Sequence, residues 1–440
     1  MFRRATAALA NPIALYTEDH FTEAVVPVKM GKRLFAQVMD PAMVQTLLQG
    51  EGRITGRSYI AQRVMQPALR DGLLTAEGEM WKAQRRAASP AFRAKCLAAL
   101  MGTFNRAAQS SQQRLTAQAN DVVDIQAEMT RASFDIIADV LWVRPGADYS
   151  SDAIVDDIQT FVTSIGRFTL SDLFPVFDRL IPRQWLAPGY HKGLEAVHRL
   201  RVLAAQIVES RKAEGAEDND LMGLMINARD PETGDPLSPQ ELVDNALTFV
   251  GAGHETTANA LSWTLSLLAQ SPHIQDALAD EATQALGGRA PTHNDLAALP
   301  LHDRVIREAL RLYPPVPMIA RAITGEVELG GTIFRPGDHV TVGVYPMQRH
   351  ENLWEDPHRF DPDRFLPERM STYHKYQWLP FGGGPRVCVG QRFAMMSMMS
   401  VLSHLTPVMR FEMVDERAPE PHLSLTLRPR TPLRLRVTTR

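Results

Sequence analysis

The sequence predicts a mainly α-helical domain that carries small β-sheets. Helical patterns dominate residues 76 to about 312, and short strand-like runs lie near the start, after residue 320 and near the end. Strand segments at both ends predict that the two ends of the chain meet in small shared sheets. Hydrophobic residues make up 45% of the 440 residues and charged residues 22%, which is typical of a globular protein with a sizeable core.

The strand-like runs and the lack of a linker define the predicted organisation. Six runs are predicted as strands, and they cover residues 24–28, 33–38, 326–329, 339–344, 423–427 and 433–437. No repeat or low-complexity segment interrupts the chain, and the most polar stretch, residues 214–220, is too short to separate domains. We therefore predict one domain over residues 1–440, with no fused reductase, because no flavin or iron–sulfur pattern appears.

Charge and cysteine content exclude several classes of protein. The net charge of -3 and the pI of about 6.5 give no global positive field that could hold nucleic acid. Two cysteines, Cys96 and Cys388, exclude a disulfide scaffold and fit a reducing compartment, so we expect a cytoplasmic protein. The apolar stretch at residues 5–10 is shorter than the core of a signal peptide, and the absence of an 18-residue apolar run predicts no membrane span.

The best-defined element is a long helix between residues 238 and 270. Ser238 is the predicted N-cap, Pro239 occupies the first helical position, and Glu241 completes a capping box. Ser271 and Pro272 end the helix, which would be about 48 Å long at 1.5 Å per residue.

Two glycines interrupt the middle of this helix. Gly251 and Gly253 each cost about 1 kcal/mol relative to alanine in a helix interior. Two interpretations stay open. Another helix could pack closely at this point, or a flat ligand could lie against the backbone, with Thr256 able to bond back to the helix and open it locally.

The segment around Cys388 carries the strongest chemical signal. A glycine-rich turn at residues 382–384 precedes this cysteine, and a helical, methionine-rich segment at residues 393–402 follows it. Free backbone N–H groups and the positive end of the helix favour a thiolate over a thiol. One thiolate without a neighbouring cysteine or histidine cannot build a zinc site, whereas a haem iron needs one thiolate on its proximal side. Cys96 is predicted to be buried and inert.

Residues 381–390 (FGGGPRVCVG) resemble the FxxGxRxCxG signature of the cytochrome P450 family, the haem-thiolate monooxygenases. The following segments resemble further motifs of the family in order and spacing: 252–257 (AGHETT), 308–311 (EALR) and 360–365 (FDPDRF). Residues 81–85 (WKAQR) resemble its WxxxR motif. The resemblance covers about residues 70–430.

The resemblance implies a fold that encloses haem b between the long helix and the cysteine-bearing loop. Cys388 would bind the iron and be the only covalent attachment, because alanine stands at position 252, where some relatives carry a glutamate esterified to haem. The residues implied to bind the cofactor are Trp81, Arg85, Ala252, Arg321, Phe381, Arg386, Cys388 and Gly390. The indole and the three arginines among them would bind the two propionates.

The resemblance also implies roles for two groups of polar residues. Glu255 and Thr256 would be catalytic, delivering protons during dioxygen activation. Glu308 and Arg311 are three apart in a helix and share a face. With Arg364 as a third member they would have a structural role, stabilising the segment that leads to Cys388.

A non-polar substrate is expected from the residues implied to surround it. These are mostly apolar and comprise Leu74, Thr248, Gly251, Ala252, Val316, Met318, Ile319 and Leu425. Arg57, Arg63 and Arg70 in a lid segment are either solvated charges or anchors for a carboxylate. A basic patch of Lys82, Arg86 and Arg392 is our hypothesis for the docking site of an electron donor.

The leading hypothesis is a monomeric monooxygenase that hydroxylates or epoxidises a small hydrophobic molecule, such as a fatty acid or terpenoid. It would use O2 and electrons from a separate ferredoxin or flavodoxin with its reductase. A peroxide-using or redox-neutral haem-thiolate enzyme is the first alternative, and the pair Glu255 and Thr256 counts against it. A non-enzymatic haem-binding sensor is the second alternative, and it would need an output domain that the chain does not show.

Overall fold

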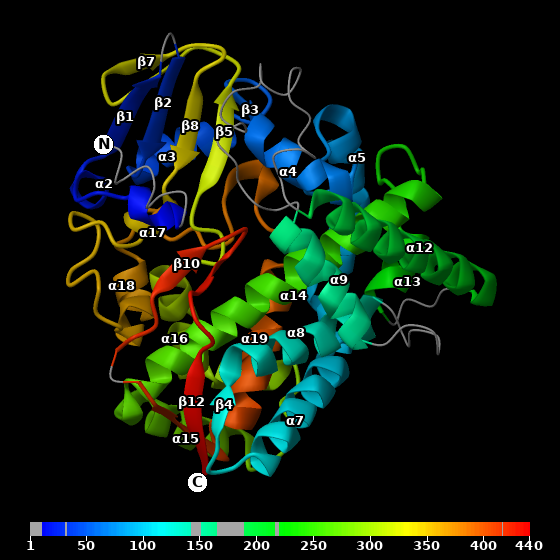
Figure 1. Ribbon diagram of the computed structural model, residues 1–440, viewed down its shortest axis with the longest axis vertical. Helices are drawn as coiled ribbons and strands as arrows, with labels where there is room; N and C mark the ends of the chain where they lie inside the picture. The colour runs from blue at the N-terminus through cyan, green and yellow to red at the C-terminus, as the bar shows by residue number, and fades with distance from the viewer. Residues whose placement is uncertain (1–10, 31–32, 142–150, 165–188, 216–219, 416) are drawn as a thin grey trace. The chain divides into compact units, whose positions relative to one another are not determined.

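Five strands from three stretches of the chain form the largest sheet, in the order β1-β2-β8-β5-β3. In this computed structural model, described for residues 11–30, 33–141, 151–164, 189–215, 220–415 and 417–440, β2 and β8 pair in parallel and the other neighbours antiparallel. Figure 1 shows these strands side by side. Their bounds are β1 Val25–Met30, β2 Arg33–Val38, β3 Thr55–Arg57, β5 Ile319–Ile323 and β8 His339–Val342.

Contacts divide the chain into two compact units. The sheet-containing unit comprises Met1–Ser58, Phe104–Ala132 and Thr256–Arg440, and the helical unit comprises Tyr59–Thr103 and Ser133–Glu255. Every strand named within the described residues belongs to the sheet-containing unit. The helices α7 Met101–Ala117, α8 Ile125–Leu141 and α14 Pro239–Ala269 each contribute residues to both units.

The remaining helices each lie within one unit. In the sheet-containing unit they are η1 Pro12–Leu15, α2 Asp19–Thr22, α3 Pro41–Gln49, α15 Pro272–Leu286, η4 Asn294–Ala298, α16 Pro300–Leu312, α17 Val344–Met347, η5 Pro362–Phe365, α18 Pro367–Met370, η6 Gly384–Arg386 and α19 Gln391–Leu405. In the helical unit they are α4 Tyr59–Leu69, α5 Gly78–Ala88, η2 Ser89–Phe92, α6 Ala94–Ala99, α9 Ser151–Ser164, α12 Tyr190–Glu214 and α13 Leu221–Asn227.

The predicted meeting of the two ends in shared sheets is confirmed in the largest sheet and wrong for the last strand. Strand β2 pairs with β8, which follows residue 318, whereas the C-terminal strand pairs with β4 and β9. The run at 423–427 is also two strands, because residues 424–426 form a bend between them. The smaller sheets comprise β4 Val122–Asp124, β9 Met409–Met413 and β12 Arg434–Thr439; β6 Val327–Leu329 and β7 Thr332–Phe334; and β10 Pro421–Leu423 and β11 Leu427–Pro429.

The long predicted helix is confirmed as α14. The amide of Ser238 donates to the Glu241 carboxylate at 2.8 Å, and the Glu241 amide donates to the Ser238 hydroxyl at 3.2 Å. This is the predicted capping box, which satisfies two backbone donors that the helix leaves unpaired. No helix in the described part of the chain combines the length and apolar character that a bilayer span requires. The predicted absence of a signal peptide concerns residues 1–10, which lie outside the described residues.

Candidate functional site

Cys388 lies at the N-terminal end of α19, as the sequence predicts. Gly390 is the N-cap of this helix, and the Cys388 amide donates to the carbonyl of Phe381 at 2.9 Å, which closes the loop between them. Cys388 is exposed although α19 is largely buried. The sulfur is therefore accessible to a ligand at a helix end that favours the thiolate. Cys96, predicted to be buried, is partly exposed on α6.

Gly384 allows the cysteine loop to rest directly on the end of α3. Its φ of +69° lies in the left-handed region, and a Cβ at this position would come within 2.2 Å of the Leu48 carbonyl oxygen. Only glycine accepts both conditions. The glycine-rich turn thus brings two backbones together and fixes the loop that carries Cys388.

Two of the arginines predicted to bind propionates meet a carboxylate that the sequence analysis missed. Glu51 accepts from Nε of Arg386 at 2.8 Å, and its other oxygen lies 3.2 Å from Nε of Arg321. All three side chains are nearly buried. Within the described residues, Nε of Arg321 is buried and makes no hydrogen bond. A buried guanidinium with an unsatisfied donor is suited to a carboxylate ligand such as a haem propionate.

Arg57 lies in the sheet, on the same face as Arg321, rather than in a separate lid segment. Strand β3 places it directly opposite Arg321 of β5, so the two side chains lie on the same face. Arg63 and Arg70, by contrast, belong to the helical unit, on α4 and at its end. The three arginines that the sequence analysis grouped therefore divide between the two units.

The predicted structural triad is present at the C-terminal end of α16. Glu308 accepts from Arg311 at 2.6 and 2.7 Å, and Nε of Arg364 lies 3.4 Å from the same carboxylate. Arg364 also donates to the carbonyl of Asp356 at 2.8 Å. The ion pair therefore connects α16 with the segment that precedes the cysteine loop.

The middle of α14 is more exposed to solvent than the segments before and after it. Residues 242–250 and 257–269 are all buried, whereas Ala252 is exposed and Glu255 and Thr256 are partly exposed. These three residues are three and four apart and share one helical face. A ligand lying against the helix would contact this face.

The two glycines of α14 have different surroundings, and each fits one of the two interpretations that the sequence left open. A Cβ on Gly253 would approach Cδ1 of Ile137 on α8 to 2.7 Å, so this glycine serves helix packing. A Cβ on Gly251 would meet no atom within 4 Å. Close packing explains the second glycine, and open space at the first leaves room for a ligand.

Trp81 and Arg85 share a face of α5, and both are partly exposed.

The position of α5 is fixed by a buried hydrogen-bond network that the sequence did not predict. The side chain of Asn245 donates to Gln84 at 3.1 Å and accepts from the Leu73 amide at 2.8 Å, and Gln84 donates to the Asp71 carbonyl at 2.7 Å. This network holds α5 against α14 within the helical unit.

The predicted pocket residues also divide between the two units. Gly251 lines a small apolar pocket of the helical unit, together with Ala68, Leu69, Ile158, Phe161, Val197, Leu200, Leu247 and Val250. Leu74 is 37% exposed, and Thr248 is buried with its hydroxyl donating to the Asp244 carbonyl at 2.7 Å. In the sheet-containing unit Val316 is 42% exposed, and Met318 and Leu425 are partly exposed. Ile319 packs against the core on β5.

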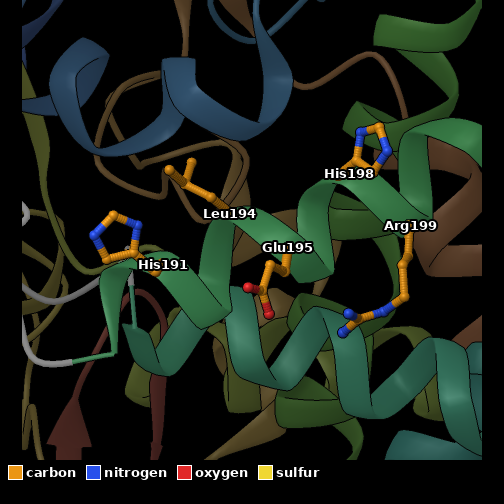
Figure 2. Close-up of a pocket in the computed structure, with 5 residues that line it drawn as sticks. All are labelled: His191, Leu194, Glu195, His198 and Arg199. Carbon is orange, nitrogen blue, oxygen red and sulfur yellow. The ribbon is translucent and has the colours of Figure 1, made fainter.

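A second pocket lies along α12 and contains none of the predicted residues. Figure 2 shows its lining side chains, His191, Leu194, Glu195, His198 and Arg199, on this one helix. Arg199 forms an ion pair with Asp157 of α9 at 2.5 Å. Its lining residues come from one helix, and none of them is a cysteine that could supply a thiolate to a haem iron.

The predicted basic docking patch is partly neutralised. Lys82 pairs with Glu79 at 2.7 Å, and Arg86 pairs with Asp230 at 2.8 Å and with Glu232 at 3.3 Å. Arg392 is exposed at the start of α19. Acidic neighbours therefore reduce the positive field that this hypothesis requires.

Comparison with known proteins gives one consistent result. The family model described as cytochrome P450 matches residues 14–437. The chain is 31% identical over 408 residues to cyclooctatin synthase of Streptomyces melanosporofaciens, covering 92% of this chain and 87% of that protein. It is 30% identical over 397 residues to cytokinin hydroxylase of Arabidopsis thaliana, covering 88% and 75%.

A solved structure is similar over nearly the same length. The crystal structure of the cytochrome P450DA heme domain has a TM-score of 0.84 and 26% identity, covering 95% of this chain and 90% of that one. The mostly helical fold with small sheets is thereby confirmed as a P450 fold. The chain belongs to the cytochrome P450 family, and it is a monooxygenase that binds haem b through a cysteine–iron bond.

Proposed function

We propose that Cys388 is the cysteine that binds the iron and that Thr256 and Glu255 are the catalytic residues. The observation that carries this proposal is the exposed face of α14 at Ala252, Glu255 and Thr256, in a helix that is buried on both sides of it. The exposed sulfur at the N-terminal end of α19 supports it. Bound haem would supply the iron centre at which dioxygen is activated.

The propionates would be held by guanidinium groups and an indole. Arg321 and Arg386 are nearly buried, and Arg57 lies opposite Arg321, so we add Arg57 to the predicted set. Trp81 and Arg85 would contribute from the shared face of α5. Arginine forks match the bidentate geometry of carboxylates. Phe381, Ala252 and Gly390 would contact the porphyrin.

The residues of α14 would control protons. The Thr256 hydroxyl can donate a hydrogen bond from the exposed face, and the neighbouring Glu255 carboxyl can resupply the proton from solvent. The residues before and after this face along the helix are buried, so the exposed positions are confined to its middle. This acid–alcohol pair favours the use of O2 with reductant over the use of peroxide.

Electrons would come from a separate donor, a ferredoxin or flavodoxin with its reductase. We propose that the chain forms a single P450 domain and acts as a monomer. Lys82 and Arg86 have acidic partners, so Arg392 is the member of the basic patch that we expect to contribute most to docking. Charge reversal at Arg392 should slow reduction at low salt.

The substrate would be a small hydrophobic molecule that is hydroxylated or epoxidised. The apolar lining of the pocket beside Gly251 supports this class, and related proteins are named a cyclooctatin synthase and a cytokinin hydroxylase. A terpenoid or fatty acid would match the apolar character of this lining.

A binding screen tests the substrate class, and a turnover assay tests the use of dioxygen. Terpenoids, fatty acids and aromatic compounds are titrated while the iron spin state is followed by absorbance. A compound that binds is then incubated either with O2, a ferredoxin and its reductase, or with peroxide alone. Product in the first reaction at a higher rate supports the proposal, and product only with peroxide contradicts it.

A further inference from the structure

Glu51 lies between two guanidinium groups that the proposed function assigns to the haem propionates. Its side chain is 10% exposed, and those of Arg321 and Arg386 are 7% and 8% exposed. The carboxylate uses one oxygen for each arginine, at 3.2 and 2.8 Å. Arg386 is only two residues from Cys388 in the chain, so its ion pair connects the Glu51 carboxylate to the segment that carries the proposed iron ligand.

The backbone around Glu51 is fixed on both sides. The Gly50 amide donates to the Thr46 carbonyl at 3.0 Å, which ends α3, and the Gly52 amide donates to the Thr55 carbonyl at 2.8 Å. The Thr55 hydroxyl donates to the Leu47 carbonyl at 2.9 Å. Glu51 is therefore held in a tight turn between α3 and β3, on the same helix end that contacts the cysteine loop.

The opposite charges of this cluster stabilise one another in a site of low exposure. Burial lowers the pKa of Arg321, Glu51 opposes that change, and Arg386 adds to it. The two cations therefore repel each other in a site of low exposure, and Glu51 is the carboxylate that compensates them. Bound propionates would add further carboxylates beside these two guanidinium groups.

We propose that Glu51 is a positioning residue of the haem site. Its carboxylate orients the guanidinium groups of Arg321 and Arg386 and places one fixed negative charge beside the cofactor. This inference rests on the assignment of both arginines to the propionates under the proposed function. A nearby negative charge favours the oxidised, more positive iron, so Glu51 lowers the reduction potential of the haem.

The reduction potential of purified holoprotein, measured by dye-linked titration, tests this role. Glu51→Gln keeps the shape and removes the charge, so its potential should be more positive than that of the wild type. Glu51→Asp keeps the charge and should restore a potential near the wild-type value. Glu420→Gln is the matched control, because Glu420 and its partner Arg430 are exposed, and its potential should not change. An unchanged potential in Glu51→Gln would overturn the proposal.

Two further measurements keep the test decisive. If Glu51→Gln retains no haem, the comparison of haem content with Glu51→Asp decides the role of the charge. Haem retained by Glu51→Asp then supports the charge pairing, and haem lost equally from both variants overturns it. Haem transfer to excess apomyoglobin should be faster from Arg321→Gln and Arg386→Gln than from the wild type. Unchanged transfer overturns the propionate assignment itself, whereas faster transfer with a wild-type potential in Glu51→Gln overturns only the role of Glu51.

Discussion

Glu308 and Arg311 form a bidentate ion pair in which neither side chain is exposed to solvent. Arg311 also donates to three carbonyl oxygens on the segment before the cysteine loop, those of Gln348, Pro357 and Arg359. The Asp361 amide donates to Glu308 at 2.9 Å. One side chain of α16 thus bonds the irregular segment between residues 348 and 359 at three points.

Glu308→Gln should destabilise the protein strongly. Removal of one partner leaves the Arg311 cation buried and uncompensated, which costs about 3–5 kcal/mol. The free energy of unfolding in denaturant and the ratio of haem to protein should both fall. The control is Asp303→Asn on the same helix, where the partner Arg307 is partly exposed and the expected loss is below about 1 kcal/mol. Equal losses in the two variants would contradict the structural role of the pair.

Gly384→Ala should weaken the cysteine loop. The substitution adds a Cβ where the Leu48 carbonyl lies 2.2 Å away, and it forces alanine into a positive φ. The positive φ alone costs about 1–3 kcal/mol. The control is Gly337→Ala, which has a φ of +94° but no atom within 4 Å of the added Cβ. Thermal unfolding and haem content should fall further in Gly384→Ala, and similar values in the two variants would show that the backbone contact is unimportant.

Thr256→Ala should lower the amount of product formed per electron consumed. The loss of its hydroxyl removes a proton donor from the exposed face of α14, so more reductant should end as hydrogen peroxide and less as product, at unchanged haem content. General acid–base groups contribute about 10²–10⁴-fold to rate, which sets the upper range of the loss. Thr264→Ala removes the same group from a buried position that bonds Ala260, and its coupling should stay at the wild-type level. Equal uncoupling in both variants would exclude a specific role for Thr256.

Acid should remove the stabilisation from the ion pair of Arg86 and Asp230. The hydrogen bonds from Arg86 lower the pKa of Asp230 to about 2, against a usual value of about 3.9. The unfolded chain therefore binds this proton first as pH falls, so the stabilisation is present above about pH 4 and is lost as pH falls towards 2. The difference in unfolding free energy between wild type and Asp230→Asn should shrink over this range. A difference that stays constant over this range would contradict the role of the ion pair.

Local signals in the sequence predicted several features that the structure shows. The capping box from Ser238 to Glu241 spans four residues, and the segment 381–390 that contains Cys388 spans ten, so both patterns are visible along the chain. Glu308 and Arg311 share one helical turn, and their pairing follows from helix geometry alone. These features depend on hydrogen bonds and spacing within a single element.

Features that depend on distant contacts could not be predicted. Glu51 and Arg386 are 335 residues apart in the chain. No pattern near Glu51 in the sequence indicates that it pairs with both Arg321 and Arg386. Arg57 meets Arg321 only because β3 pairs with β5. The apolar run at 423–427 resembled one strand, but its middle residues bend and its two ends belong to different strands. Contacts between residues that are far apart in the chain determine these features.

The absorbance spectrum of the reduced carbon-monoxide complex tests most directly whether Cys388 binds the iron. The wild-type protein should show the red-shifted Soret band of thiolate ligation. Cys388→His should shift the band to the position typical of imidazole ligation, and Cys388→Ala should lose the thiolate band. A thiolate-type band that persists in Cys388→Ala would contradict the account.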